Sequence, residues 1–121
     1  MVGQSKSKGS ESEVIEFNEL KRQLARERVL KELEADDYAR NYVGKHVTII
    51  DIDWRTINGK LYAVAKCYID EDKVHKWLVF GGRIVTDQLK LAEQVLKKGK
   101  AVRCKIELRE SRTGRKYLYL I

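Results

Sequence analysis

After Val43 the sequence alternates apolar and polar residues with a period of two, and this pattern constrains the fold more than any other feature. It is clearest over 101–110, where apolar residues alternate with charged ones. Successive side chains of a strand point to opposite faces of a sheet, so the pattern predicts a β-strand with one buried face. Two similar runs, at 45–54 and 60–69, are separated by an Asn-Gly dipeptide at 58–59. This dipeptide is typical of a tight hairpin, so the two runs are expected to pair.

The rest of this region completes a mainly β domain. A third strand is predicted over 75–80 and ends at two glycines, and a last strand is predicted over 116–121. Between the third and fourth strands, 83–98 has apolar residues at helical spacing, and Gly99 stands where a helix often ends. The expected order of elements is therefore β-β-β-α-β-β.

This order, with these strand lengths and glycine positions, resembles the oligonucleotide/oligosaccharide-binding (OB) fold, a five-stranded Greek-key barrel. The resemblance covers 43–121 and includes no signature motif, and another small α+β sheet would also fit. It implies a ligand across the second and third strands, beside the loops 55–60 and 111–116. Within the OB fold, the chain most resembles small proteins that bind single-stranded DNA.

The first 42 residues differ in composition from the rest. Residues 1–13 are rich in Ser, Gly, Lys and Glu and are expected to form a flexible tail. Residues 14–42 contain no Gly or Pro and have the composition of a helical extension. At helical spacing its apolar residues lie on two opposite faces: Phe17, Leu20 and Leu24 on one, and Val29 and Leu33 on the other. The extension is expected to pack on the barrel, to join copies of the chain or to recruit a partner protein.

The charge of the chain suggests its partner. Of 121 residues, 25 are Lys or Arg and 18 are Asp or Glu, and residues 43–121 alone carry a net charge of +8. A small domain this basic favours a polyanion, either nucleic acid or an acidic surface. The charged fraction of 36% with few Asn and Gln also resembles a thermophile's composition. No apolar run is long enough for a membrane span, and two cysteines make no disulfide framework, so a cytoplasmic location is expected.

Binding of a single strand requires cations for the phosphates and flat side chains on which bases stack. The two loops supply the predicted phosphate contacts: Arg55, Lys60, Arg112, Arg115 and Lys116. The strands and their ends supply predicted stacking residues and further lysines: Trp54, Tyr62, Lys66, Tyr68, Lys76, Trp77, Tyr117 and Tyr119. Each aromatic residue could instead belong to the core, and this alternative stays open above all for Trp77, Tyr117 and Tyr119.

Other chemistry finds little support. His46 and His75 are not spaced with cysteines as zinc ligands, Cys67 and Cys104 are expected to be buried thiols, and no glycine pattern matches a phosphate loop. We therefore expect no metal, no cofactor and no enzymatic activity. The predicted function is sequence-tolerant binding of single-stranded DNA in replication, recombination or repair. An RNA-binding barrel and a protein-interaction adaptor are the alternatives.

Overall fold

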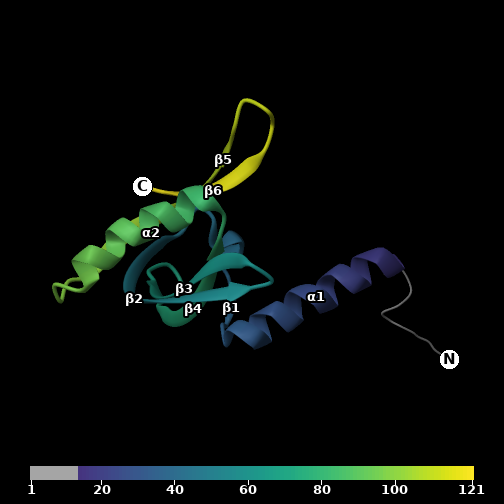
Figure 1. Cartoon of the computed structure of the whole chain (residues 1–121), viewed down its shortest axis with the longest axis horizontal. Helices are drawn as coiled ribbons and strands as arrows, with labels where there is room; N and C mark the ends of the chain where they lie inside the picture. Colours follow the sequence, from purple (N-terminus) through teal and green to yellow (C-terminus); the bar gives the residue numbers. More distant parts are fainter. Residues whose placement is uncertain (1–13) are drawn as a thin grey trace.

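The computed structural model describes residues 14–121, so the predicted tail 1–13 lies outside the described residues. It shows a curled, six-stranded half-barrel sheet with two helices (Figure 1). In chain order the elements are α1 (Phe17–Leu33), β1 (Asp37–Tyr38), the 3₁₀ helix η1 (Ala39–Tyr42), β2 (His46–Ile57), β3 (Lys60–Ile69), β4 (Val74–Gly81), α2 (Arg83–Leu96), β5 (Val102–Glu110) and β6 (Lys116–Leu120). The strand order is β1-β4-β3-β2-β5-β6, so β1 and β6 form the two ends of the sheet.

The elements predicted from the alternation are confirmed in type and order. β2 and β3 form the expected hairpin, with Ile57 opposite Lys60 and positive φ angles of 52° at Asn58 and 78° at Gly59. A type I′ turn needs positive φ at both central residues, which explains the Asn-Gly pair. α2 lies between β4 and β5, as predicted.

The main core lies on the inner face of the curled sheet, where α2 covers it. The inward residues of the central strands β2, β3 and β4 are buried together with Val85 and Leu89 of α2. Cys67 and Cys104 are buried free thiols, as expected. Burial raises the pKa of Cys67 to about 12 and that of Cys104 to about 11, so both thiols are protonated at neutral pH.

A bulge in β2 changes the register that strict alternation predicts. The pairing with β3 shifts between Ile49 and Asp51, and Ile50 is exposed. The extra residue brings Ile49 and Ile52 to the same inner face, although an odd number of positions separates them. From this point on, residues expected on the outer face lie on the inner one, and Trp54 is among them.

The segment 14–42 is not helical throughout, which differs from the prediction. α1 ends at Leu33, because Glu34 takes a left-handed conformation with φ of 55° and its N–H bonds back to Lys31. The next residues form β1, which pairs in parallel with β4, so the sheet has six strands rather than five. Ala39 and Tyr42 of η1 then enter the main core. Residues 35–42 are thus joined to the sheet.

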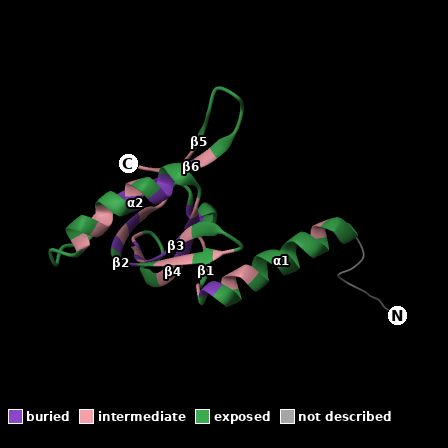
Figure 2. Cartoon of the chain, viewed as in Figure 1, coloured by how far each residue is buried: buried purple, intermediate pink, exposed green. Residues whose placement is uncertain are grey.

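A second apolar cluster holds α1 against the outer face of the sheet. Leu33 packs on Val64 of β3 and Val79 of β4, with Val29 and Trp77 around them. The other face of α1 carries exposed Phe17, Leu20 and Leu24, and the helix extends away from the sheet (Figures 1 and 2). Of the two predicted apolar faces, the one with Val29 and Leu33 packs on the chain's own domain.

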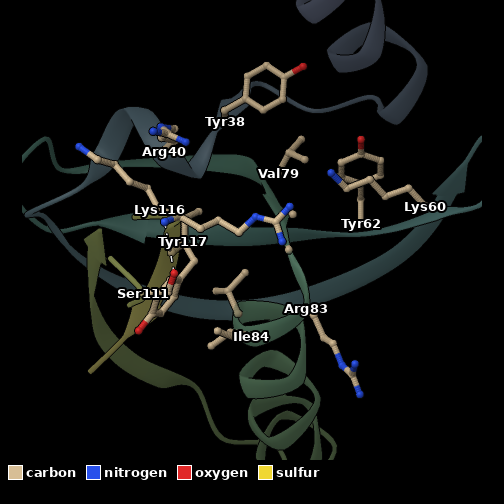
Figure 3. A pocket seen from close by; sticks show the side chains of 15 residues that line it. Tyr38, Arg40, Lys60, Tyr62, Val79, Arg83, Ile84, Ser111, Lys116 and Tyr117 are labelled. Carbon is tan, nitrogen blue, oxygen red and sulfur yellow. Dashed lines mark hydrogen bonds between the residues drawn. The ribbon is translucent and has the colours of Figure 1, made fainter. Parts of the chain in front are cut away.

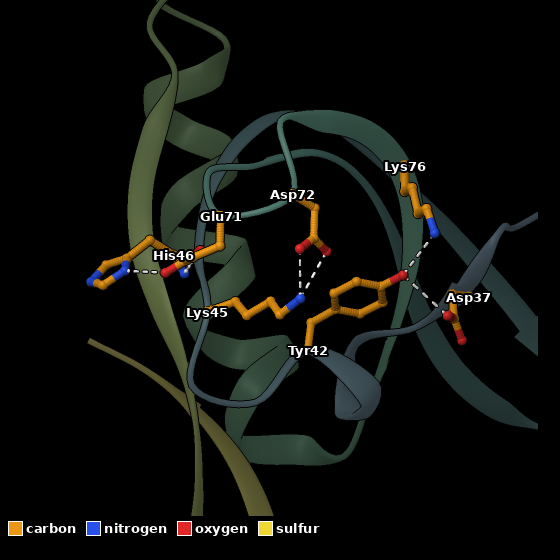
Figure 4. Close-up of polar contacts among 7 residues, drawn as sticks. All are labelled: Asp37, Tyr42, Lys45, His46, Glu71, Asp72 and Lys76. Atoms are coloured by element: carbon orange, nitrogen blue, oxygen red, sulfur yellow. Dashed lines mark hydrogen bonds and ion pairs between the residues drawn. The ribbon is translucent and has the colours of Figure 1, made fainter.

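Polar contacts join residues 37–46 to the β3–β4 turn and β4 (Figure 4). The Lys45 ammonium binds both carboxylate oxygens of Asp72 at 2.7 and 2.8 Å. The Tyr42 hydroxyl accepts a hydrogen bond from Lys76 at 2.9 Å and donates one to Asp37 at 3.2 Å. These contacts hold η1 and the start of β2 at one end of the half-barrel.

Replacing Leu33 by Ala should lower the free energy of unfolding by about 2–5 kcal/mol, because the side chain is only 2% exposed and anchors α1. Leu24→Ala is the matched control on the same helix. Leu24 is 53% exposed, so its loss should change stability by no more than about 0.5 kcal/mol. Urea denaturation followed by circular dichroism measures both. Equal losses in the two variants would contradict the packing of α1 described above.

A second prediction concerns Glu71, whose carboxylate accepts hydrogen bonds from the backbone and ring nitrogens of His46, both at 2.9 Å. These bonds lower the pKa of Glu71 from about 4.5 to about 2. A carboxyl whose pKa is lower in the folded state stabilises the fold at any pH above its pKa in the unfolded chain. This contribution is lost as the pH falls from about 4.5 to about 2. Glu71→Gln should therefore melt earlier than the wild type at pH 6 and together with it at pH 2. Glu32→Gln, an exposed change on α1, is the control and should melt together with the wild type at both pH values. If the melting temperature of Glu71→Gln differs from that of the wild type by the same amount at both pH values, the charge of Glu71 does not have the proposed role.

Candidate functional site

A cleft lies between β4 and β6, where the curled sheet does not close. Within residues 14–121, no strand pairing joins β6 to β4 or to β1. The cleft has a volume of about 630 Å³ (Figure 3). Its lining comes from η1, β1, β3, β4, the start of α2 and the β5–β6 hairpin: Tyr38, Arg40, Lys60, Tyr62, Val79, Gly81, Gly82, Arg83, Ile84, Val85, Ser111, Arg115, Lys116, Tyr117 and Leu118.

Among residues 14–121, all charged residues that line the cleft are cations. They are Arg40, Lys60, Arg83, Arg115 and Lys116. None of the five forms an ion pair with a residue of 14–121, whereas Arg55, Arg103 and Arg109 elsewhere on the surface do. Unpaired cations that converge on one concavity create a positive potential that attracts anions.

Three tyrosines stand among these cations. Figure 3 shows Tyr62 and Lys60 on one side of the cleft, Tyr117 and Lys116 on the other, and Tyr38 between the two sides. All three tyrosines are partly exposed, and Tyr38 and Tyr62 also pack at the edge of the apolar cluster beneath α1, so only part of each of these two rings is open to solvent. Partly exposed rings beside cations are what base stacking and phosphate contact require together.

Local structure explains how these rings and charges are held. Gly81 pairs with Tyr62 across the sheet, and a Cβ at Gly81 would approach the Tyr62 ring to 3.3 Å. The absence of a side chain there lets the ring lie over β4. The Lys60 ammonium stands 5.3 Å from the centre of the Tyr62 ring. The Tyr38 hydroxyl donates to the backbone oxygen of Arg26 at 2.7 Å, and burial raises the pKa of Tyr38, so it stays a neutral donor.

The β5–β6 turn presents the two cations of the opposite wall. Ser111 accepts a hydrogen bond from the Arg115 N–H on its hydroxyl at 3.2 Å, and its own N–H donates to the Arg115 carbonyl at 2.8 Å. Gly114, with φ of 81°, closes the turn. These contacts fix the backbone of Arg115 while its side chain stays exposed.

Five of the residues predicted from the sequence come together in the cleft. They are Lys60, Tyr62, Arg115, Lys116 and Tyr117. Leu118 is buried, and Tyr117 and Tyr119 lie in the opposite register of the strand. The side chains of these two tyrosines therefore do not belong to the core. Tyr119 lies outside the cleft, with the Arg109 guanidinium 3.8 Å from the centre of its ring.

The two tryptophans lie outside the cleft. Because of the bulge in β2, Trp54 faces inward and packs against the main core, and its indole N–H donates to Glu93 of α2 at 2.9 Å. Trp77 faces outward but belongs to the cluster beneath α1. Contacts within the chain thus occupy both side chains, which were predicted as stacking residues.

The other predicted residues are distributed over the surface. Arg55 is held by Asp53 at 2.8 Å and by Glu34 at 3.3 Å, and these carboxylates raise its pKa. Lys76 lies in the inward register and binds the Tyr42 hydroxyl. Tyr68 stands against His75 with ring centres 4.9 Å apart. Lys66 is half-buried opposite Trp77, and Arg112 is exposed at the β5–β6 turn; neither lines the cleft.

Three charged or aromatic residues of the cleft were not predicted from the sequence: Tyr38, Arg40 and Arg83. Tyr38 and Arg40 belong to a segment predicted as helical, and their place depends on the pairing of β1 with β4. Arg83 follows the glycine pair at the end of the predicted third strand. Because the OB resemblance places the ligand on that strand, this position could have indicated a phosphate contact.

Comparison with known proteins adds no assignment. No family model matches the sequence, and no curated protein and no solved structure resembles the chain at a significant level. Over residues 14–121, no group of three or more His, Cys, Asp or Glu side chains is placed to hold a metal ion. Neither helix of this part of the chain is long and apolar enough to cross a membrane.

Proposed function

We propose that the chain is a non-enzymatic, OB-like protein that binds single-stranded nucleic acid, DNA in the first place, with little sequence preference. The strand lies in the cleft between β4 and β6. The observation that carries this proposal is the lining of that cleft: five cations, three tyrosines and no carboxylate among the residues that the structure describes.

The arrangement of strands supports the relation to the OB fold. β2, β3 and β4 form an antiparallel meander, β5 pairs with β2, and β6 pairs with β5. Such barrels are partly open and bind oligonucleotides over strands 2 and 3 and the loops 1–2 and 4–5. In this chain, β3 and β4 correspond to strands 2 and 3. Lys60 stands at the end of the loop that corresponds to loop 1–2, and Arg115 stands in the turn that corresponds to loop 4–5. The cleft is lined by all four.

The unpaired state of the cations favours a phosphate ligand. An arginine held by a carboxylate, such as Arg55, must lose that partner before it can bind a phosphate. The five cleft cations have no such partner within 14–121, so a bound backbone gains the release of its counterions without that cost. A concavity of about 630 Å³ has the size of a small-ligand pocket and suits one strand better than a duplex.

The direct experiment is a salt-titrated binding curve for the full chain with oligo-dT, oligo-U and a DNA duplex of equal length. The proposal expects salt-sensitive binding that is strongest for a single strand, and the first two oligomers compare DNA with RNA. A chain with no salt-sensitive binding to any of the three would be better explained as a protein-interaction adaptor.

Replacing Arg115 and Lys116 together by Ala should remove two phosphate contacts. The plot of log K against log salt should flatten by about 1.4, since each contact to a single strand contributes about 0.7. Lys97→Ala/Lys98→Ala is the charge-matched control. These lysines follow the far end of α2, about 20 Å from its first turn at 1.5 Å per residue, which exceeds the screening length of about 8 Å. An equal slope in the Arg115/Lys116 variant and the wild type would exclude this turn from the site.

Tyr117→Ala should weaken binding by about 1–3 kcal/mol, the usual value of one stacked base, and leave the salt slope unchanged. Tyr119→Ala is the control, because Tyr119 lies on the same strand and the same face but outside the cleft. Affinity and melting temperature should be measured for both variants. If the Tyr119 variant loses as much affinity as the Tyr117 variant, stacking in the cleft is not what binds the strand.

A further inference from the structure

A second groove lies between α1 and the segment 37–41. It has a volume of about 770 Å³. Its α1 side consists of residues at helical spacing on one face: Gln23, Arg26, Glu27 and Leu30. Its other side consists of Asp37, Tyr38, Arg40 and Asn41.

This groove adjoins the cationic cleft. Tyr38 and Arg40 line both. Figure 3 shows these two residues on the side of the cleft opposite Ile84 of α2. A strand that leaves the cleft past Tyr38 would have the groove beside α1 next to it.

The chemistry of the groove differs from that of the cleft. It contains two carboxylates, and that of Asp37 is saturated: it accepts from the Tyr38 N–H, the Asn41 amide and the Tyr42 hydroxyl. The Arg26 guanidinium forms an ion pair with the Glu19 carboxylate at 3.2 Å. By contrast, Glu27 has no hydrogen bond or ion pair with any residue of 14–121. Among the described residues of the groove, its exposed carboxylate is the free charged acceptor.

A free carboxylate selects against phosphate and for hydrogen-bond donors. Guanine presents two donors side by side on its Watson–Crick edge, the ring N–H and the 2-amino group, and one carboxylate can accept both. Thymine and uracil present a single ring N–H between two carbonyl oxygens. The Glu27 carboxylate would repel these two oxygens. Leu30 and the Tyr38 ring pack at the edge of the cluster beneath α1, and their partly exposed sides offer the apolar surface on which the plane of a base can lie.

We propose that the groove between α1 and 37–41 is a nucleobase subsite that selects guanine through Glu27. This inference rests on the proposed function, because the base reaches the groove as part of a strand held in the cleft. It adds a base preference to a binder whose contacts in the cleft are otherwise sequence-tolerant.

The test compares three 12-mers on the full chain: oligo-dT, four repeats of TTG and four repeats of TTI, in which inosine lacks the 2-amino group of guanine. The wild type should bind the guanine repeat at least about fivefold more tightly than the inosine repeat, the lower end of what a base-specific contact contributes. The salt slopes should be equal, because the phosphates are the same. Isolated guanines between thymines cannot form the guanine runs that stack into four-stranded structures.

Glu27→Gln should reduce the guanine-to-inosine ratio to below about twofold, because an amide offers one acceptor where the carboxylate offers two. Glu32→Gln, on another face of α1, should keep the wild-type ratio. Melting temperatures of both variants confirm that they are folded. A wild-type ratio near one, or a ratio that survives in Glu27→Gln, overturns the guanine subsite and leaves the proposed function standing. Absence of salt-sensitive binding to all three oligomers overturns both.

Discussion

The short parallel pairing of β1 with β4 is the contact on which the candidate site depends. Two residues, Asp37 and Tyr38, occupy the edge of β4 beside Leu78 and Val79, while the end of β4 at Gly81 faces β6 across an open cleft. The same pairing brings Tyr38 and Arg40 to the cleft and places α1 over the outer face of the sheet. A full pairing of β4 with β6 would have closed the half-barrel and removed the concavity.

The outer face of the sheet shows how packing and binding divide one surface. An uncovered face of β3 and β4 would expose Val64, Val79 and Trp77, which burial under Leu33 of α1 avoids. This burial favours the fold through the hydrophobic effect and removes these residues from any ligand. Binding is left to the rim, where cations without carboxylate partners remain in water. On the N-terminal part of α1, Phe17 and Leu24 are exposed.

The fold could largely be predicted from the sequence because its strands alternate and its turns carry diagnostic residues. The hairpin at Asn58-Gly59 and the helix between β4 and β5 follow from local preferences alone. β1 could not be predicted, since two residues have no period and their strand exists only through the edge of β4. The bulge at Ile50 was equally hidden, because β-branched residues fill both registers of this strand, and it is the reason Trp54 points inward.

For the candidate site, the register of Tyr117 stayed open in the sequence and was decided by the burial of Leu118. The sequence by itself determined the basic residues of the last turn and Lys60 and Tyr62 after the hairpin. These follow from charge and from the period of two, which are local properties. Only the tertiary structure decided which of them converge. Arg55 resembles Arg115 in sequence, yet carboxylates 2 and 21 positions away neutralise it. The pair with Asp53 is local, since residues two apart share one face of a strand, but the contact with Glu34 and the meeting of sheet edges depend on distances between segments remote in the chain, and no local pattern encodes those distances.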